Sequence, residues 1–295
     1  MKKAAALWLS LLLSLLVPLC SFAEVQSLPQ EGEAPWPPVE SAYSEDFLSY
    51  DDGTLSIHIE KDVVGETNVF YVYVKLTDVS QFRTALADWS HSKATRPVWS
   101  MAKQNNAVLA INGDYYSYQN TGIVVRSGKI IRQKPVSTRD TLVIDGNGDF
   151  QFLTQNTQQE WKDFLNSGVE IREAFSFGPA LITDGQEIQF KYREKTSCGY
   201  PTPAQRMVLC QMGHLEYMIF ACEGPEQNKK AGLSIPEVIP LLLARGVQKA
   251  YNMDGGTSAT VMMGTTRINA PDSKYRNVSD IIYFATLVSP ENEGE

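Results

Sequence analysis

Short β-like runs separated by tight turns do most to restrict the fold of this chain. Three pairs of runs are joined by only three or four residues that include glycine, so each pair predicts a β-hairpin. Strands linked this closely pair antiparallel. The hairpins are expected at 122–132, 141–153 and 206–222, and single strands at 56–60, 69–76, 107–111, 180–183, 249–253 and 280–287.

Helix signals are few. Residues 95–105 predict a helix that begins near Pro97, because proline suits a first helical turn. A second helix is expected from Ser234, where Glu237 completes a capping box, to Gly246, with Pro240 bending it. No strand–helix–strand rhythm is present. The sequence therefore predicts an α+β fold of mostly antiparallel or mixed sheets with a few packed helices, in a single domain.

The N-terminus has the pattern of a secretory signal peptide. Lys2 and Lys3 precede an apolar run, and Ser21-Phe22-Ala23 provides small residues at a cleavage site. We therefore expect a signal peptide at 1–23 and a secreted or otherwise extracytoplasmic protein with no membrane span after cleavage. The Pro-, Glu- and Ser-rich stretch 24–46 is expected to be a flexible leader. The domain itself is expected at 47–290, followed by a tail at 291–295.

Charge and metal-ligand content exclude several classes of function. The formal net charge is −8 and no basic cluster is present, which argues against nucleic-acid binding. An anionic substrate would need a local positive site. Cys198, Cys210 and Cys222 leave at least one free thiol after signal cleavage. The three histidines are far apart in sequence, so a zinc site is not expected.

Two turns carry the chemistry of a candidate site. Asn252-Met-Asp254 ends one predicted strand and continues into Gly255, Gly256, Thr257 and Ser258. Adjacent glycines bring backbone N–H groups close to a ligand, and an acid with hydroxyls beside them suits a polar, anionic group such as phosphate. A simple Asp-Gly turn is the alternative for this segment.

The second turn, Asn112-Gly113-Asp114, ends another predicted strand in the same way. If the two strands are neighbours, Asp114 and Asp254 face one pocket. Tyr115 and Tyr116 offer aromatic faces for a sugar, and Arg206 is a candidate phosphate clamp, with a surface ion pair as its alternative. Asn269 and Arg276 lie in a polar loop and by themselves indicate only solvated side chains.

The order of these motifs resembles the phosphodiester glycosidase family over about residues 105–285. The resemblance rests on Asn-Gly-Asp-Tyr-Tyr (112–116), Phe-Gly-Pro-Ala-Leu-Ile-Thr-Asp-Gly (177–185), Pro-Ala-Gln-Arg (203–206), Gly-Leu-Ser-Ile-Pro-Glu-Val (232–238), Asn-Met-Asp-Gly-Gly-Thr-Ser (252–258), Arg-Ile-Asn (267–269) and Arg-Asn-Val-Ser-Asp (276–280). It implies that the site is formed by Asn112, Gly113, Asp114, Arg206, Asn252, Asp254, Gly255, Gly256, Ser258, Asn269 and Arg276.

Three departures from the family pattern bear on the substrate. Asp114 and Thr257 stand where glycines are common, and Cys222-Glu-Gly224 replaces a common Asp-Gly-Arg. An arginine that would bind phosphate is therefore missing at that point. The charge of Glu223 implies a different substrate from that of other members.

The resemblance implies an extracytoplasmic hydrolase that cleaves the sugar–oxygen bond of a sugar-1-phosphodiester in a glycoconjugate or cell-envelope polysaccharide. Asp254, Asp114 and Arg206 are the expected catalytic residues. No cofactor is expected to be required, although a carboxylate-and-amide oxygen site suits Ca²⁺ or Mg²⁺. Two alternatives stay open: a metal-assisted phosphoesterase that cleaves P–O, and a non-catalytic protein that binds an envelope polysaccharide.

Overall fold

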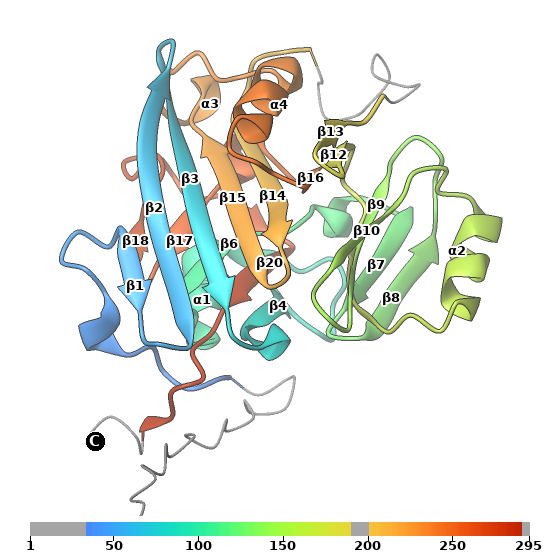
Figure 1. Ribbon diagram of the computed structural model, residues 1–295, viewed down its shortest axis with the longest axis horizontal. Helices are drawn as coiled ribbons and strands as arrows, with labels where there is room; N and C mark the ends of the chain where they lie inside the picture. The colour runs from blue at the N-terminus through green and yellow to red at the C-terminus, as the bar shows by residue number, and fades with distance from the viewer. Residues whose placement is uncertain (1–33, 190–200, 291–295) are drawn as a thin grey trace, which may run out of the picture.

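The computed structural model describes residues 34–189 and 201–290 of the 295-residue chain. Every strand pairing in the described part is antiparallel, and the few helices lie on the outside of the sheets (Figure 1). The expected α+β class with mostly antiparallel sheets in one domain is confirmed. The predicted signal peptide and C-terminal tail lie outside the described residues.

The largest sheet has eight strands. Their order across the sheet is β1 (Ser49–Asp51), β2 (Leu55–Val64), β3 (Thr67–Leu76), β15 (Glu216–Cys222), β14 (Arg206–Gly213), β16 (Lys249–Asn252), β12 (Ala180–Thr183) and β13 (Gln186–Glu187). Helices α3 (Pro225–Asn228) and α4 (Ile235–Leu243) lie at its upper end in Figure 1. The expected capping box of Ser234 and Glu237 is present at the start of α4.

A five-stranded sheet packs against the inner face of the first sheet. Its order is β18 (Thr266–Arg267), β17 (Val261–Met263), β6 (Leu109–Asn112), β20 (Asp280–Phe284) and β4 (Phe82–Leu86). Helix α1 (Val98–Gln104) covers its other face through Val98, Met101 and Ala102, and Pro97 lies at its N-cap as expected. The short pair β5 (Arg96–Pro97) and β19 (Asn277–Val278) lies beside this helix.

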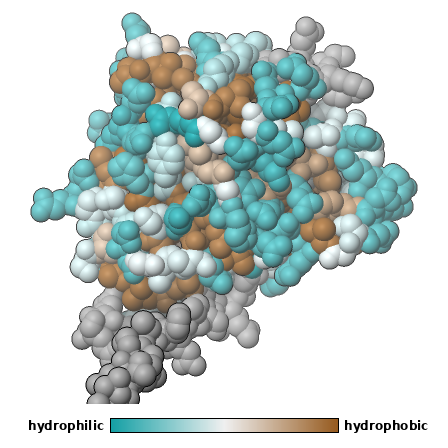
Figure 2. Space-filling view, viewed as in Figure 1, coloured by the Kyte–Doolittle hydropathy of each residue, from teal (hydrophilic) through white to brown (hydrophobic). Residues whose placement is uncertain are grey.

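A second five-stranded sheet forms the right-hand lobe of Figure 1. Its order is β10 (Phe150–Leu153), β9 (Thr141–Asp145), β11 (Ile171–Phe175), β7 (Gly122–Arg126) and β8 (Lys129–Lys134). Helix α2 (Gln158–Asn166) buries Trp161 against this sheet and leaves a hydrophilic outer surface, seen at the right of Figure 2. The sequence prediction missed α2, β11 and β4.

One apolar core joins the three sheets. Alternation along each strand sends one set of side chains inward, where they lose contact with water. Buried residues of the eight-stranded sheet, such as Ile57 and Leu209, pack in one cluster with Ile111 and Ile282 of the second sheet and Phe175 of the third. Strand ends from all three sheets therefore come close together around this core.

The predicted flexible leader is wrong for its second half. A short 3₁₀ turn, η1, spans Glu40–Ala42. The Tyr43 hydroxyl donates to the Val108 carbonyl at 3.2 Å, and the Tyr43 ring contacts that of Tyr50 with 4.7 Å between centroids. Buried aromatic contacts outweigh the unstructured tendency of a Pro- and Glu-rich composition, so the folded part begins before Phe47. No helix of the described residues is long and apolar enough to cross a membrane.

Candidate active site

The turn after β16 lies against the first residues of β14. A side chain at Gly255 would collide with the Gln205 carbonyl oxygen, so only glycine fits there. Gly256 has a φ of +55° and its N–H donates to the same carbonyl at 3.1 Å. The glycine pair thus fixes the direction in which Asp254 leaves the strand, and the Gly256 amide is used within the protein.

The turn after β6 packs on β20 in a similar way. The Gly113 N–H donates to the Asp280 carbonyl at 2.9 Å. A side chain at Gly113 would overlap the Asp280 carboxyl group, with its Cβ 2.5 Å from Cγ. Asp114 follows at once, and the 3₁₀ turn η3 (Tyr116–Tyr118) continues the chain. Gly113 is therefore the residue that lets two acidic side chains approach each other.

The two turns meet, although their strands are not neighbours. Strand β6 and strand β16 belong to different sheets, so the two turns come together without the strand pairing on which the sequence argument made their meeting depend. The Asn112 side chain joins the turns: its Nδ2 donates to the Asp254 carbonyl at 2.8 Å, and its Oδ1 accepts from the Thr260 N–H at 3.1 Å. The Asn252 side chain joins the end of β16 to the loop before β12, because its Nδ2 donates to the Gly178 carbonyl at 2.9 Å. Asn112 and Asn252 thus orient the backbone of the site.

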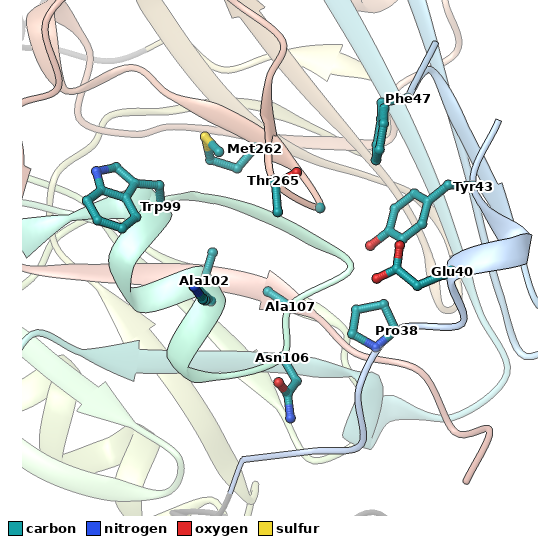
Figure 3. Close-up of a pocket in the computed structure, with 12 residues that line it drawn as sticks. Pro38, Glu40, Tyr43, Phe47, Trp99, Ala102, Asn106, Ala107, Met262 and Thr265 are labelled. Atoms are coloured by element: carbon teal, nitrogen blue, oxygen red, sulfur yellow. The ribbon is translucent and has the colours of Figure 1, made fainter. Parts of the chain in front are cut away.

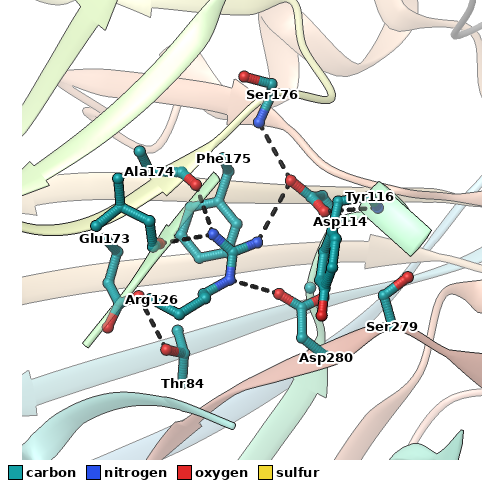
Figure 4. Close-up of polar contacts among 12 residues, drawn as sticks. Thr84, Asp114, Tyr116, Arg126, Glu173, Ala174, Phe175, Ser176, Ser279 and Asp280 are labelled. Atoms are coloured by element: carbon teal, nitrogen blue, oxygen red, sulfur yellow. Dashed lines mark hydrogen bonds and ion pairs between the residues drawn. The ribbon is translucent and has the colours of Figure 1, made fainter. Parts of the chain in front are cut away.

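A buried arginine lies behind these turns (Figure 4). Arg126, at the end of β7, is fully buried and donates from Nε to Asp280 Oδ2 at 2.6 Å. Its Nη2 lies 3.4 Å from Asp114 Oδ2, and its guanidinium lies 3.9 Å from the centre of the Phe175 ring. Asp114 also accepts from the N–H groups of Tyr116 and Ser176. The carboxylate of Asp114 is therefore occupied within the protein.

The acids around Arg126 outnumber it. Burial raises the pKa of Asp280 to about 7, although Arg126 opposes the shift. Burial likewise raises the pKa of Glu173, on β11, to about 8. Asp280 Oδ1 is buried and has no hydrogen-bond partner among the described residues. The nearby arginines do not offset the cost of burying these acids, so Asp280 and Glu173 retain protons near neutral pH.

Asp254 is the acid of this group that reaches solvent. It is partly exposed, and burial raises its pKa to about 6, while a hydrogen bond from Ser258 and the charge of Arg276 oppose the rise. Arg276 is exposed and donates to Thr257 Oγ1 at 3.1 Å. Asp254 is therefore largely ionised at neutral pH and lies beside an accessible cation, which is the arrangement required of a base that works next to an anionic group.

Three other predicted positions surround this centre. The Arg206 side chain is buried and donates to the main-chain carbonyls of Leu233 and Thr202. Asn269 uses both ends of its amide on the backbone, donating to Ala259 at 2.9 Å and accepting from Val261 at 2.8 Å. Tyr115 is partly exposed and packs edge-on against Phe177. Arg206 and Asn269 therefore hold the loops that form the site.

Comparison with known proteins identifies this arrangement. Residues 105–285, more than half of the chain, match the phosphodiester glycosidase family. The chain belongs to this family. No curated protein matches it.

Solved structures share the fold of this phosphodiester glycosidase family member at low sequence identity. The catalytic domain of zebrafish N-acetylglucosamine-1-phosphodiester alpha-N-acetylglucosaminidase, auto-inhibited by its pro-peptide, superposes with a TM-score of 0.63 at 16% identity, over 83% of this chain and 87% of that one. A hypothetical protein from Synechocystis superposes with a TM-score of 0.57 at 14% identity, over 78% of this chain and 62% of that one.

The departures from the family pattern have structural explanations here. Asp114 serves as a partner of Arg126, and Thr257 as a partner of Arg276. Glu223 is buried and accepts from Asn68 Nδ2 at 2.6 Å and from the Ala270 N–H at 2.7 Å, and also from the Asn228 side chain. Its charge thus ties the loop at Ala270 to β3 and α3.

The sequence prediction missed Arg126 and Asp280 as members of the site. Arg126 stands next to a Ser-Gly turn and reads as part of a hairpin loop, while Asp280 reads as the last residue of the 276–280 motif and the first of a strand, with no role in the site. A charged residue at the end of an otherwise apolar strand is the signal that would have singled out both. Within residues 34–189 and 201–290, no group of three or more His, Cys, Asp or Glu is placed to hold a metal ion.

Proposed function

We propose that the protein is an extracytoplasmic hydrolase that cleaves the bond between an anomeric carbon and the oxygen of a phosphodiester. Family membership supports the class of reaction. The observation that carries the proposal is the partly exposed Asp254, whose pKa is raised to about 6 beside the accessible Arg276. The predicted signal peptide supports an extracytoplasmic location.

Asp254 acts as the general base in this proposal. It removes a proton from water as the water oxygen bonds to the anomeric carbon, and the carbon–oxygen bond to phosphate breaks with its electron pair on the phosphate oxygen. The products are a free sugar and a phosphate monoester. A phosphate is already a good leaving group, so the reaction needs less help from a general acid than an ordinary glycoside does.

Arg276 stabilises the departing phosphate. Its guanidinium is exposed, and its hydrogen bond to Thr257 holds it over the turn that carries Asp254. A cation in this place offsets negative charge that develops on the phosphate oxygen, and a preorganised cation does so without rearranging water. The hydroxyl of Thr257, in the position of a common family glycine, therefore orients the cation that receives the leaving group.

Asp114 has a positioning role in this scheme. Its oxygens accept from two backbone amides and face Arg126, so it shapes the turn and raises the pKa of Asp254 through its charge. The same contacts disfavour a metal-assisted phosphoesterase, because that reaction would need Asp114 as an open ligand. Loss of activity on chelation with EDTA would instead support a required Ca²⁺ or Mg²⁺ ion.

Substitution of Asp254 tests the proposal. The Asp254→Asn variant keeps the size of the side chain but cannot accept a proton, and we expect its turnover of a sugar-1-phosphodiester to fall by roughly 10²–10⁴-fold. Asp163→Asn, at an exposed position on α2, is the matched control and should keep full activity. Undiminished turnover in a folded Asp254→Asn protein would rule out this assignment.

A non-catalytic polysaccharide-binding protein is the remaining alternative. It would show no turnover on any member of a panel of methyl phosphodiesters of sugar 1-phosphates. Retained binding that Asp254→Asn leaves unchanged would then replace the proposed hydrolase with a binding protein.

A further inference from the structure

Exposed aromatic side chains gather beside the proposed site. The large apolar side chains with more than a third of their surface exposed number seven in the described part of the chain, and three of them lie in this one place. These three are Trp99, Tyr118 and Tyr275, which are 44%, 53% and 42% exposed. We call them the aromatic track. Exposed aromatic clusters of this kind mark binding surfaces, because water-exposed rings are otherwise costly.

The track is continuous with the turn that carries Asp254. Arg276 donates to Thr257 on that turn, and its guanidinium lies 5.8 Å from the centre of the Tyr118 ring. Tyr275 precedes Arg276 in the chain, and its ring centre lies 6.4 Å from that of Trp99. Contacts therefore run from the proposed reaction centre through Arg276 to Trp99 on α1.

Trp99 leads from the track into a cavity. The cavity has a volume of about 210 Å³ and is lined by Trp99, Met262, Thr265, Tyr43 and Phe47, among others. Figure 3 shows Trp99 at one end of it and Tyr43 and Phe47 at the other. Glu40, Lys103 and Asn106 also line it, so hydrogen-bonding groups lie among aromatic faces. This mixture suits a sugar ring, which presents both C–H faces and hydroxyl groups.

Exposed cations lie along the track: Arg96, Lys103, Lys274 and Arg276. The acids nearby are Glu40, Asp254, Asp272 and Glu226, so the two signs of charge are about balanced there, whereas the chain as a whole carries −8. This surface therefore repels an anionic ligand less than the rest of the protein does.

A buried cation lies under the Tyr275 ring. The Arg267 guanidinium is 4.9 Å from the centre of that ring, and only 6% of the residue is exposed. Its Nη1 donates to the Ser273 carbonyl at 2.9 Å, whereas its Nε and Nη2 have no hydrogen-bond partner among the described residues. Buried donors without an acceptor are costly, so these two nitrogens point to an acceptor group that a ligand would supply.

We propose that the aromatic track and its cavity bind the sugar-phosphate units that flank the scissile bond in a linear poly(glycosyl phosphate). The rings pack against sugar faces while Arg276, Lys103 and their neighbours offset the phosphates. The inference rests on the proposed hydrolase activity and extends it, because it assigns a polymer as the substrate instead of a single diester. Loss of one ring that stacks on a ligand lowers affinity by about tenfold, as it does for nucleic-acid bases.

Two substrates that share one scissile bond test the inference. One is the methyl phosphodiester of N-acetylglucosamine 1-phosphate, and the other is a poly(N-acetylglucosamine 1-phosphate). We expect the double variant Trp99→Ala with Tyr275→Ala to lose about tenfold or more in kcat/KM on the polymer and to keep its activity on the monomer. Trp89→Ala is the control, because Trp89 is 46% exposed and contacts Lys129 instead. Equal effects on both substrates, or no effect on the polymer, would overturn the inference.

A binding measurement distinguishes failure of this inference from failure of the proposed hydrolase activity. The polymer is titrated against the tryptophan fluorescence of the unmodified chain and of Trp99→Phe. Binding without turnover, with the fluorescence change lost in Trp99→Phe, supports the track and refutes the hydrolase. Turnover of the monomer without polymer binding supports the hydrolase and refutes the track. Absence of both refutes both.

Discussion

The pKa of Asp254 predicts how the rate of hydrolysis depends on pH. Burial raises its pKa to about 6, and as a general base it works only when ionised. The rate constant kcat/KM should therefore rise with pH and level off above an inflection near 6. One pH unit below the inflection about a tenth of the molecules carry the ionised acid, so the rate should be about tenfold below the plateau, and two units below it about a hundredfold.

Removing the charge of Arg276 should move this inflection. Arg276 lowers the pKa of Asp254, so Arg276→Gln raises it, by up to about one pH unit for an exposed cation close to a carboxylate. The Arg276→Lys variant retains the charge and should retain the inflection, although both variants lose leaving-group stabilisation. The inflection should move to higher pH, because loss of a neighbouring cation makes the ionised carboxylate less stable. More alkaline conditions are then needed to reach the plateau.

Initial rates on the methyl diester between pH 4 and pH 9, at constant ionic strength, provide the measurement. Substrate binding is separated from chemistry by following kcat and kcat/KM together. An inflection below pH 5, or one that stays in place in Arg276→Gln, would refute the reasoning that burial and Arg276 together set the ionisation of Asp254.

Two further predictions concern the buried cluster. Gly113→Ala places a methyl group 2.5 Å from Cγ of Asp280. Overpacking of this kind should lower the free energy of unfolding, measured by urea titration, by about 1–3 kcal/mol. Gly213→Ala is the control, because its nearest contact is 3.5 Å away, and equal losses in the two variants would contradict a steric role for Gly113. Glu173 has a folded-state pKa of about 8 against an ordinary 4.5, so its stabilising contribution is lost as pH rises between those values. Glu173→Gln should remove up to about 1.4 kcal/mol per pH unit from that slope, whereas the exposed Glu216→Gln should leave it unchanged.

Local signals in the sequence predicted the hairpins and α4 well. Each hairpin has its turn chemistry and its strands within 17 residues or fewer, and the capping box of Ser234 and Glu237 needs only four. Strands β4 and β11 were missed because Arg83 and Glu173 interrupt their apolar pattern, although both side chains are buried. Tertiary partners, which a local pattern does not contain, make those positions compatible with a strand.

The sequence predicted only part of the candidate site, because the rest depends on tertiary contacts that a local pattern does not contain. Asn112 and Asp254 stand out because each ends an apolar strand at a glycine turn, and the structure joins them by a hydrogen bond of 2.8 Å. Arg126 and Asp280 are 154 residues apart in the chain, and their ion pair exists only because the end of β7 lies beside the start of β20, a strand of a different sheet. No spacing rule connects residues at such a separation, so this part of the site required the fold.

The position of bond cleavage tests the central claim most directly. Hydrolysis of the methyl diester of a sugar 1-phosphate in water enriched in ¹⁸O places the heavy oxygen on whichever atom the water attacks. Attack at the anomeric carbon, with Asp254 as the base, predicts ¹⁸O in the free sugar and none in the methyl phosphate when the products are weighed by mass spectrometry. Heavy oxygen in the phosphate, with the sugar released as its 1-phosphate, would contradict the proposed reaction.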